Sequence, residues 1–191
     1  MKIGVLSLQG AFREHRIMME RCGAEVIEIR KPEELDLING LILPGGESTT
    51  IGKLMVDWGF IDKIKIRAAE GMAIYATCAG MIVLSKDIID SSQPRLGLLN
   101  AKVRRNAFGR QRESFEVDLC IPNFGVKPFP AVFIRAPYIE SIGPEVITLA
   151  TLNERIVFVR QGKLLATAFH PELTSDDRIH KYFLAMVNDQ V

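Results

Sequence analysis

Short apolar runs alternate with helical patterns along the first half of the chain, and this alternation limits the available folds more than any other feature. Residues 11–22 and 48–69 place apolar side chains at helical spacing, and Gly23 and Gly59 interrupt those patterns. Strand–helix–strand order needs right-handed crossovers, so we predict an α/β fold with a mostly parallel sheet and helices on both of its faces. The runs expected to form its strands are Lys2–Ser7, Ala24–Ile29, Gly40–Leu43 and Met72–Thr77.

The second half of the chain has a different pattern, with short strand-like pieces separated by turn residues. We expect them to add antiparallel strands to the same sheet, because no linker-like composition separates the two halves. A closing helix follows, with an apolar face between Ile179 and Val187 and a cap at Thr174 or Ser175. The strand-like pieces are Ala101–Val103, Phe115–Cys120, Ala131–Arg135, Val146–Thr151, Arg155–Val159 and Leu164–Phe169.

The composition excludes several classes of protein. With 191 residues and 48% hydrophobic side chains the chain can bury a core, and we expect residues 1–191 to form one domain. The net charge of +1 gives no electrostatic footprint for nucleic acid or an anionic membrane. No apolar run reaches the roughly 18 residues that span a bilayer, and we recognise no secretion signal. The three cysteines suit neither a disulfide framework nor a zinc site, so the sequence predicts a cytoplasmic protein without a metal.

Cys78 is the most informative residue for function. It lies between a buried strand and a helical pattern, with the small residues Ala76, Ala79 and Gly80 beside it. A sharp strand-to-helix turn exposes one side chain above a sheet and needs small neighbours. The amino-terminal end of a helix favours a thiolate, and its free N–H groups can stabilise an oxyanion. A buried structural cysteine is the alternative, and these residues alone give the two interpretations equal weight.

His170-Pro171-Glu172 is the second informative motif. On an extended segment the side chains of residues 170 and 172 point to the same side, so we expect the carboxylate to contact the imidazole. Such a carboxylate fixes the imidazole tautomer and stabilises the protonated ring. Taken alone, the motif is more typical of a strand-end histidine beside a helix-capping acid. Only the fold can bring it to Cys78, and both motifs lie where we expect strands to end, at the edge where α/β sheets form their sites.

Other segments carry weaker signals. Pro44–Ser48 follows a buried strand, and its two glycines allow a ligand to approach the backbone, although the spacing does not match a nucleotide-binding loop. The basic stretch Arg104–Arg112 is typical of a solvated hairpin tip, while one of its arginines could clamp a carboxylate. Arg135 could be a second anion contact or part of a surface ion pair. We assign no chemistry to four residues and expect three of them in the core and the last on the surface: His15, Cys22, Cys120 and His180.

Together these motifs resemble the class I, triad-type glutamine amidotransferases, and more closely the glutaminase subunits of pyridoxal 5′-phosphate synthase. The resemblance covers essentially the whole chain, and Asn106–Gln111 and Phe133–Pro137 are its most specific parts. One departure is Ala76, which stands where the family's Gly-x-Cys-x-Gly turn has its first glycine. The other matching segments are Gly4–Leu6, Leu8–Ala11, Leu43–Thr49, Thr77–Met81, Ser114–Glu116 and His170–Thr174.

The resemblance implies a flavodoxin-like three-layer fold and the hydrolysis of L-glutamine to L-glutamate and ammonia. In it, Cys78 is the nucleophile, His170 the general base and acid, and Glu172 the residue that orients the histidine. The backbone N–H groups of Gly46 and Ala79 are the expected oxyanion hole. The residues expected to bind L-glutamine are Gly46, Glu47, Ser48, Arg105, Ile134 and Arg135.

The resemblance also implies a partner. Ammonia would pass to a synthase subunit, in a large complex around a dodecameric synthase core, which builds pyridoxal 5′-phosphate from a pentose phosphate and a triose phosphate. This chain would need no cofactor, because pyridoxal 5′-phosphate is the product of the complex. Gln9 and Gly10 follow the first expected strand, so we expect them at the rim of the site, as candidates for the partner contact.

Two other functions remain open from the sequence. A cysteine hydrolase or protease of similar fold needs no His-x-Glu motif near the end of the chain, so His170 and Glu172 argue against it. A catalytically idle, glutamine-binding regulatory subunit needs no complete triad, and an activity measurement distinguishes it from an enzyme.

Overall fold

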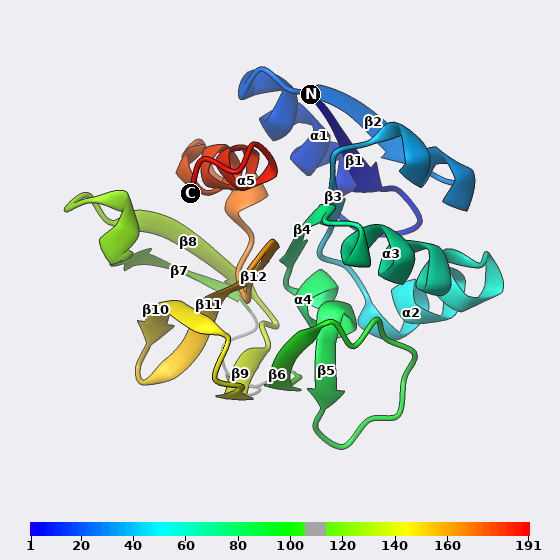
Figure 1. Cartoon of the computed structure of the whole chain (residues 1–191). Coiled ribbons are helices and arrows are strands. Elements are labelled where there is room, and N and C mark those ends of the chain that lie inside the picture. Colours follow the sequence, from blue (N-terminus) through cyan, green and yellow to red (C-terminus); the bar gives the residue numbers. More distant parts are fainter. Residues whose placement is uncertain (106–113) are drawn as a thin grey trace.

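Five parallel strands form the centre of the main sheet in our computed structural model, which describes residues 1–105 and 114–191 (Figure 1). Their order across the sheet is β2-β1-β3-β4-β12. Every residue of β3 and β4 is buried, because helices cover both faces of these apolar runs. The strands are β1 (Lys2–Leu6), β2 (Glu25–Ile29), β3 (Gly40–Leu43), β4 (Ala73–Thr77) and β12 (Leu164–Thr167).

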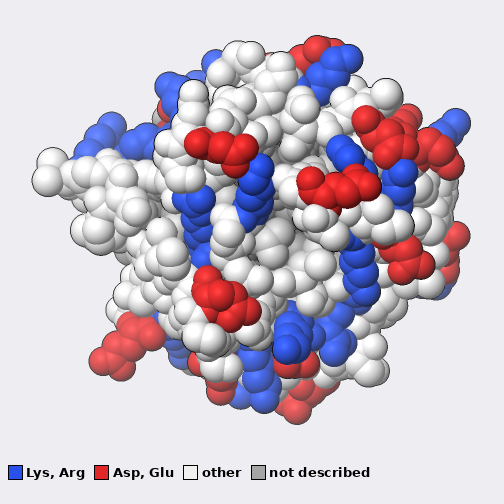
Figure 2. Space-filling model, viewed as in Figure 1, with Lys and Arg blue, Asp and Glu red and all other residues white. Residues whose placement is uncertain are grey.

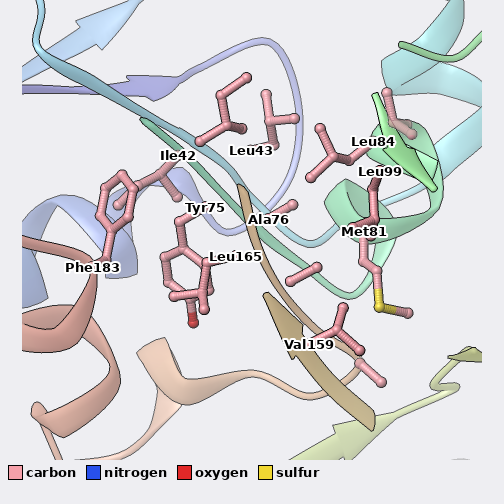
Figure 3. Packing of buried hydrophobic residues seen from close by; sticks show 14 of the residues in the cluster. Ile42, Leu43, Tyr75, Ala76, Met81, Leu84, Leu99, Val159, Leu165 and Phe183 are labelled. Carbon is pink, nitrogen blue, oxygen red and sulfur yellow. The ribbon is translucent and has the colours of Figure 1, made fainter. Parts of the chain in front are cut away.

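Helices cover the two faces of this sheet in two groups. One face packs against α1 and α5, and the other against α2, α3 and α4 (Figure 1). In the core, Phe183 of α5 lies on one side of the central strands, and Met81 and Leu84 of α4 lie on the other (Figure 3). The predicted α/β fold with helices on both faces is therefore confirmed. The helices are α1 (Phe12–Arg21), α2 (Ser48–Asp57), α3 (Phe60–Ala69), α4 (Ala79–Leu84) and α5 (Arg178–Val187).

The second half of the chain extends the sheet beyond β12 with largely antiparallel strands. The order continues β12-β11-β9-β6-β5, with β10 paired to β11 and with β5 parallel to β6. The sequence prediction missed two of these strands, because β5 is largely polar and β9 carries a charged residue and directly follows a proline turn. The added strands are β5 (Ser85–Ile88), β6 (Leu99–Arg104), β9 (Tyr138–Ile142), β10 (Ile147–Leu152) and β11 (Arg155–Gln161).

Two of the predicted strands do not join the main sheet. β7 (Ser114–Leu119) and β8 (Phe129–Ile134) pair with each other in a separate antiparallel sheet, so the expectation that all pieces extend one sheet is wrong. Apolar side chains alternate along β8, where Phe133 stacks on Phe115 of β7 and also packs against Phe169. Short 3-10 helices complete the fold at η1 (Pro32–Leu37), η2 (Pro122–Phe124) and η3 (Pro171–Leu173).

Several individual expectations are corrected. The closing helix starts at Arg178 with Asp177 at its N-cap, and the Thr174 hydroxyl accepts the N–H of Asp176 before the helix begins, so neither Thr174 nor Ser175 caps it. His180 is fully buried, because it lies beside Ile179 and Phe183 on the wide apolar face of α5.

The cysteines outside the site also differ from the expectation. Cys120 is exposed, because it follows Leu119 at the end of β7 and inward-facing and outward-facing positions alternate along that strand. Cys22 is half-buried at the end of α1. His15, in contrast, is fully buried as expected.

The surface carries charges of both signs. Acidic and basic side chains are interspersed over the face shown in Figure 2. Ion pairs such as that of Arg104 with Glu140 join charged side chains of the described residues. This face therefore presents no large field of a single sign. Within residues 1–105 and 114–191, no helix has both the length and the apolar character that crossing a bilayer requires.

Candidate active site

Four neighbouring parallel strands end at one edge of the sheet and bring the predicted site residues together. β1 leads to Gln9, β3 to Gly45, β4 to Cys78 and β12 to His170. The loops after these strands surround a cavity of about 350 Å³, which is the size of a small-molecule site. All residues assigned from the sequence line it except Glu172, which lies behind His170: Gln9, Gly10, Gly46, Glu47, Ser48, Cys78, Ala79, Arg105, Ile134, Arg135 and His170.

Cys78 occupies a strained turn between β4 and α4. Its backbone has φ 47° and ψ −104°, in a region that non-glycine residues rarely adopt. The Cys78 N–H donates to the carbonyl of Thr167 at 2.8 Å, and the thiol lies 3.9 Å from the carbonyl oxygen of Ile134. Gly80 is required here, because a Cβ would lie 2.1 Å from the carbonyl oxygen of Leu43. The sharp turn holds the thiol in the cavity at the amino-terminal end of a helix.

His170 connects Cys78 to Glu172. The backbone N–H of His170 donates to the carbonyl of Val132 at 2.8 Å, and this bond fixes the backbone of His170 beside β8. Its Nδ1 lies 2.7 Å from Oε1 of Glu172. Burial by itself would lower the pKa of His170, but the hydrogen bonds and negative charges of Cys78 and Glu172 outweigh it and raise the pKa to about 10. The site therefore favours the protonated form of the His170 ring.

The local geometry of this pair differs from the prediction. His170 is not followed by an extended segment, because Pro171 starts the 3-10 helix η3 and Glu172 lies within it. The side chains meet because the tight turn folds the carboxylate back onto the ring. Glu172 is fully buried, which would raise its pKa, yet His15 and His170 hold the pKa below its ordinary value. The carboxylate therefore stays ionised.

Glycines let the loops after β1 and β3 approach the reactive pair. A Cβ on Gly45 would lie 2.4 Å from Cε1 of His170 and 3.4 Å from Cβ of Cys78. The Gly45 carbonyl accepts the N–H of Ala11 at 2.9 Å, and a Cβ on Gly10 would lie 1.9 Å from that carbonyl oxygen. Any larger side chain at these two positions would push the loops apart and away from the thiol.

The expected ligand-binding residues lie on the far side of the cavity. Arg105 donates to Oε1 of Glu47 at 3.3 Å, and Glu47 caps α2 by accepting the N–H of Thr50. Arg135 has a positive φ of 42°, beside Ile134 on the cavity wall. The cavity thus offers both a carboxylate and guanidinium groups to a small zwitterion. The Asn106–Gln111 block of the resemblance lies outside the described residues.

Sequence reasoning missed Gln93, which links two of these residues. Its Oε1 accepts hydrogen bonds from Arg105 Nη1 at 3.0 Å and from the Ser48 hydroxyl at 3.2 Å. It is 9% exposed and lies in the segment between β5 and β6, where no sequence motif marks it. Gln93 therefore holds Arg105 and Ser48 in place without lining the cavity.

Known proteins match this chain over nearly its whole length. The model of the SNO glutamine amidotransferase family matches residues 5–189. The "Pyridoxal 5'-phosphate synthase subunit PdxT" of Moorella thermoacetica is 60% identical, over 98% of this chain and 100% of its own. The protein of the same name from Pelotomaculum thermopropionicum is 57% identical, over 96% of this chain and 94% of its own.

Solved structures also match this chain over nearly its whole length. A structure described as "Crystal structure of glutamine amidotransferase" is 53% identical, covers 97% of this chain and 98% of its own, and superposes with a TM-score of 0.93. The structure of PurLQS from Thermotoga maritima matches over 99% of this chain and 96% of its own, and with 19% identity and a TM-score of 0.64 it shares the fold. The predicted resemblance is confirmed: the chain belongs to the SNO glutamine amidotransferase family.

Proposed function

We propose that this chain is the glutaminase subunit of a pyridoxal 5′-phosphate synthase. It hydrolyses L-glutamine to L-glutamate and ammonia through a Cys78–His170–Glu172 triad and delivers the ammonia to a synthase subunit. The observation that carries the proposal is one cavity in which a strained cysteine meets a histidine that is bonded to a buried carboxylate. The printed names of the PdxT relatives support the choice of pathway.

The proposed reaction uses only groups of this chain. The Cys78 thiolate attacks the side-chain amide carbon of glutamine, and the N–H groups of Gly46 and Ala79 stabilise the oxyanion. Protonated His170 gives its proton to the leaving nitrogen, so ammonia departs and a thioester remains. Neutral His170 then takes a proton from water, which hydrolyses the thioester to glutamate and restores the thiolate. Pyridoxal 5′-phosphate is the product of the complex and takes no part in this step.

One part of the cavity suits the two charged groups that glutamine carries on its α-carbon. In this proposal Arg105 and Arg135, which line the cavity, bind its α-carboxylate, and Glu47 beside Arg105 binds its α-ammonium group. Gly46, Ser48 and Ile134 complete the wall beside the reactive pair. A substrate with both charges and a side-chain amide at the right distance would satisfy all of these groups together.

The partner in this proposal is a synthase subunit that forms a dodecameric core and joins ammonia to a pentose phosphate and a triose phosphate. Gln9 and Gly10 lie on the cavity wall after β1, where a partner that covers the strand ends would reach them. Gln9 Oε1 accepts the N–H of Glu47 at 2.8 Å, and a Cβ on Gly46 would lie 2.5 Å from the same oxygen. A contact on Gln9 therefore bears on the Gly46 peptide.

We expect the isolated chain to be a poor glutaminase that its synthase activates. If the Gly46 peptide must turn to aim its N–H at the oxyanion, a partner that fixes this turn raises kcat by roughly 10²- to 10³-fold, the value of one such donor. The measurement is steady-state ammonia release with and without an equimolar amount of synthase. Equal kcat values in both states would refute activation, and no ammonia release in either state would refute the glutaminase and favour an idle regulatory subunit.

We expect Gln93→Leu to raise KM for glutamine about tenfold while kcat changes less than about threefold. Arg105 and Ser48 lose their shared acceptor, so the carboxylate clamp loses its position, whereas the thiol and imidazole are untouched. Steady-state kinetics in the synthase complex measure both constants. Lys86→Ala, which removes an exposed side chain of β5 outside the cavity, is the control. An unchanged KM in Gln93→Leu would contradict this role.

A further inference from the structure

A line of buried polar side chains continues behind the triad, away from the cavity. Oε2 of Glu172 lies 3.4 Å from Nε2 of His15, and Nδ1 of His15 lies 3.1 Å from Nε2 of His180. His15 comes from α1 and His180 from α5, two helices on the same face of the sheet (Figure 1). Both histidine side chains are fully buried. The proposed reaction uses neither of them, so their presence in the core needs a separate explanation.

The hydrogen bonds assign the ring protons. In the described parts of the chain, Nδ1 of His180 has no hydrogen-bond partner. A buried N–H without an acceptor is strongly disfavoured, so His180 carries its proton on Nε2 and donates it to Nδ1 of His15. His15 then carries its own proton on Nε2. Nε2 lies 3.1 Å from the hydroxyl oxygen of Thr77, with which it forms a hydrogen bond, and 3.4 Å from Glu172 Oε2, a buried oxygen with no hydrogen-bond partner among the described residues.

The other tautomer of His15, with its proton on Nδ1, is unfavourable both at His180 and at Glu172. With the proton on Nδ1 of His15, His180 would have to accept it and would carry a buried N–H on its unpartnered nitrogen. The bare Nε2 of His15 would then accept the O–H of Thr77, and no N–H would face the buried Oε2 of Glu172, which has no hydrogen-bond partner in the described part of the chain. Two neutral rings in the first arrangement avoid both penalties. Burial is the main cause that lowers the pKa of both histidines, to about 3 for His180, so both rings are neutral near pH 7.

We propose that His15 is a positioning residue for the triad: its Nε2–H holds the second oxygen of Glu172, and His180 holds His15 in this orientation. The proposal rests on the glutaminase function proposed above. Glu172 is then fixed by a histidine on each side, with His170 on Oε1 and His15 on Oε2. The two contacts fix the rotation of the carboxylate and, through it, the plane of the His170 ring.

His15 also reaches the loop after β3 through Thr77. The Thr77 hydroxyl accepts the backbone N–H of Gly45 at 3.0 Å, and Gly45 lies so close to the reactive pair that a Cβ on it would meet the His170 ring and Cβ of Cys78. One imidazole therefore contacts both the residue that orients the base and the residue that anchors the glycine loop. The titratable groups around it are Glu172 from η3, His170 just before η3, His180 from α5, Tyr75 from β4 and Glu14 from α1 itself.

Two substitutions of His15 separate its role as a donor to Glu172 from its role as an acceptor for His180. In His15→Gln, the side-chain NH₂ takes the place of Nε2–H, so the donor to Glu172 remains and the acceptor for His180 is lost. In His15→Asn, the side-chain oxygen takes the place of Nδ1, so the acceptor for His180 remains and the donor to Glu172 is lost. Each variant serves as the matched control of the other, because both remove the ring and both leave a smaller polar side chain.

We expect His15→Asn to lower kcat in the synthase complex about ten- to a hundredfold, with KM for glutamine nearly unchanged. Loss of the N–H raises the pKa of Glu172, so the acid limb of the kcat profile moves to higher pH. His15→Gln is expected to retain most of kcat and the position of the acid limb, although both variants unfold at a lower temperature. Equal losses of kcat in the two variants, with no movement of the acid limb, would overturn the proposal and leave His15 a packing residue.

Two NMR measurements on the isolated protein do not depend on turnover. Proton–nitrogen correlation spectra of the histidine rings are expected to show His15 protonated on Nε2 and bare on Nδ1 near pH 7. Carbon-13 titration of the Glu172 carboxyl gives its pKa directly, and we expect it to rise in His15→Asn and not in His15→Gln. A bare Nε2 on His15 overturns the proposal even if neither variant folds. Absence of ammonia release from the wild-type complex would refute the glutaminase instead, and the spectra would still decide the role of His15.

Discussion

Cys78→Ser is expected to abolish ammonia release from glutamine while the protein remains folded. The substitution is nearly isosteric, so the strained turn at φ 47° and the packing beneath it are preserved. A serine hydroxyl is a far weaker acid than a thiol, and His170, whose pKa is raised, is a poor general base for it. Removing a nucleophile of this kind costs on the order of 10⁶-fold in kcat. The measurement is ammonia release by the synthase complex at saturating glutamine.

Cys120→Ser provides the matched control, because Cys120 is an exposed free cysteine outside the cavity. It is expected to keep wild-type kcat and KM. Thermal unfolding of both variants establishes that the fold survives. Turnover within a hundredfold of wild type in a folded Cys78→Ser protein would show that another group attacks the amide, and would remove the basis for the proposed mechanism.

The parallel half of the fold could be predicted because its strands are buried on both faces. β3 and β4 lie under helices on either side, so they appear in the sequence as uninterrupted apolar runs that end at glycine or cysteine turns. The antiparallel half gives weaker signals. β5 has the sequence Ser-Lys-Asp-Ile, which alone does not predict a strand, and its pairing with β6 supplies what the local sequence lacks.

The assignment of β7 and β8 failed for a different reason. Both were predicted as strands, and their alternating patterns are correct, but such a pattern does not state which partner a strand takes. The stacking of Phe115 on Phe133 joins the two strands, and the contact of Phe133 with Phe169 attaches them to the segment that leads to His170. The pairing of β7 with β8, and not with a strand of the main sheet, depends on this packing in three dimensions and cannot be read from either strand's own sequence.

The residues of the candidate site that have reactive side chains and follow a central strand could be predicted from the sequence. Cys78 and His170 are 92 positions apart, yet each follows a central parallel strand, and the rule that sites form at carboxyl ends of strands places them together. Gln93, His15 and His180 could not be found in this way. Their roles depend on partners that are distant in the sequence, and the local patterns around the two histidines indicate ordinary helix faces.

Glu172→Gln is expected to lower kcat strongly, but less than His170→Ala or Cys78→Ala. The carboxylate accepts from His170 on one oxygen and faces the N–H of His15 on the other. A glutamine amide has only one oxygen, so its NH₂ group must oppose one of these two donors. The substitution therefore disturbs the His170 tautomer without removing a group that forms or breaks bonds.

The order of the three losses follows from the roles. In a serine protease, loss of the orienting carboxylate costs about 10⁴-fold in kcat, and loss of the nucleophile or the base costs about 10⁶-fold. We expect the same order here in the synthase complex, with KM for glutamine nearly unchanged in Glu172→Gln. Glu25→Gln, an exposed change at the start of β2, is the control and is expected to behave as wild type. Losses of equal size in folded Glu172→Gln, His170→Ala and Cys78→Ala proteins would mean that Glu172 does more than orient the histidine, since a residue acting only through the imidazole leaves the nucleophile and the base with part of their activity.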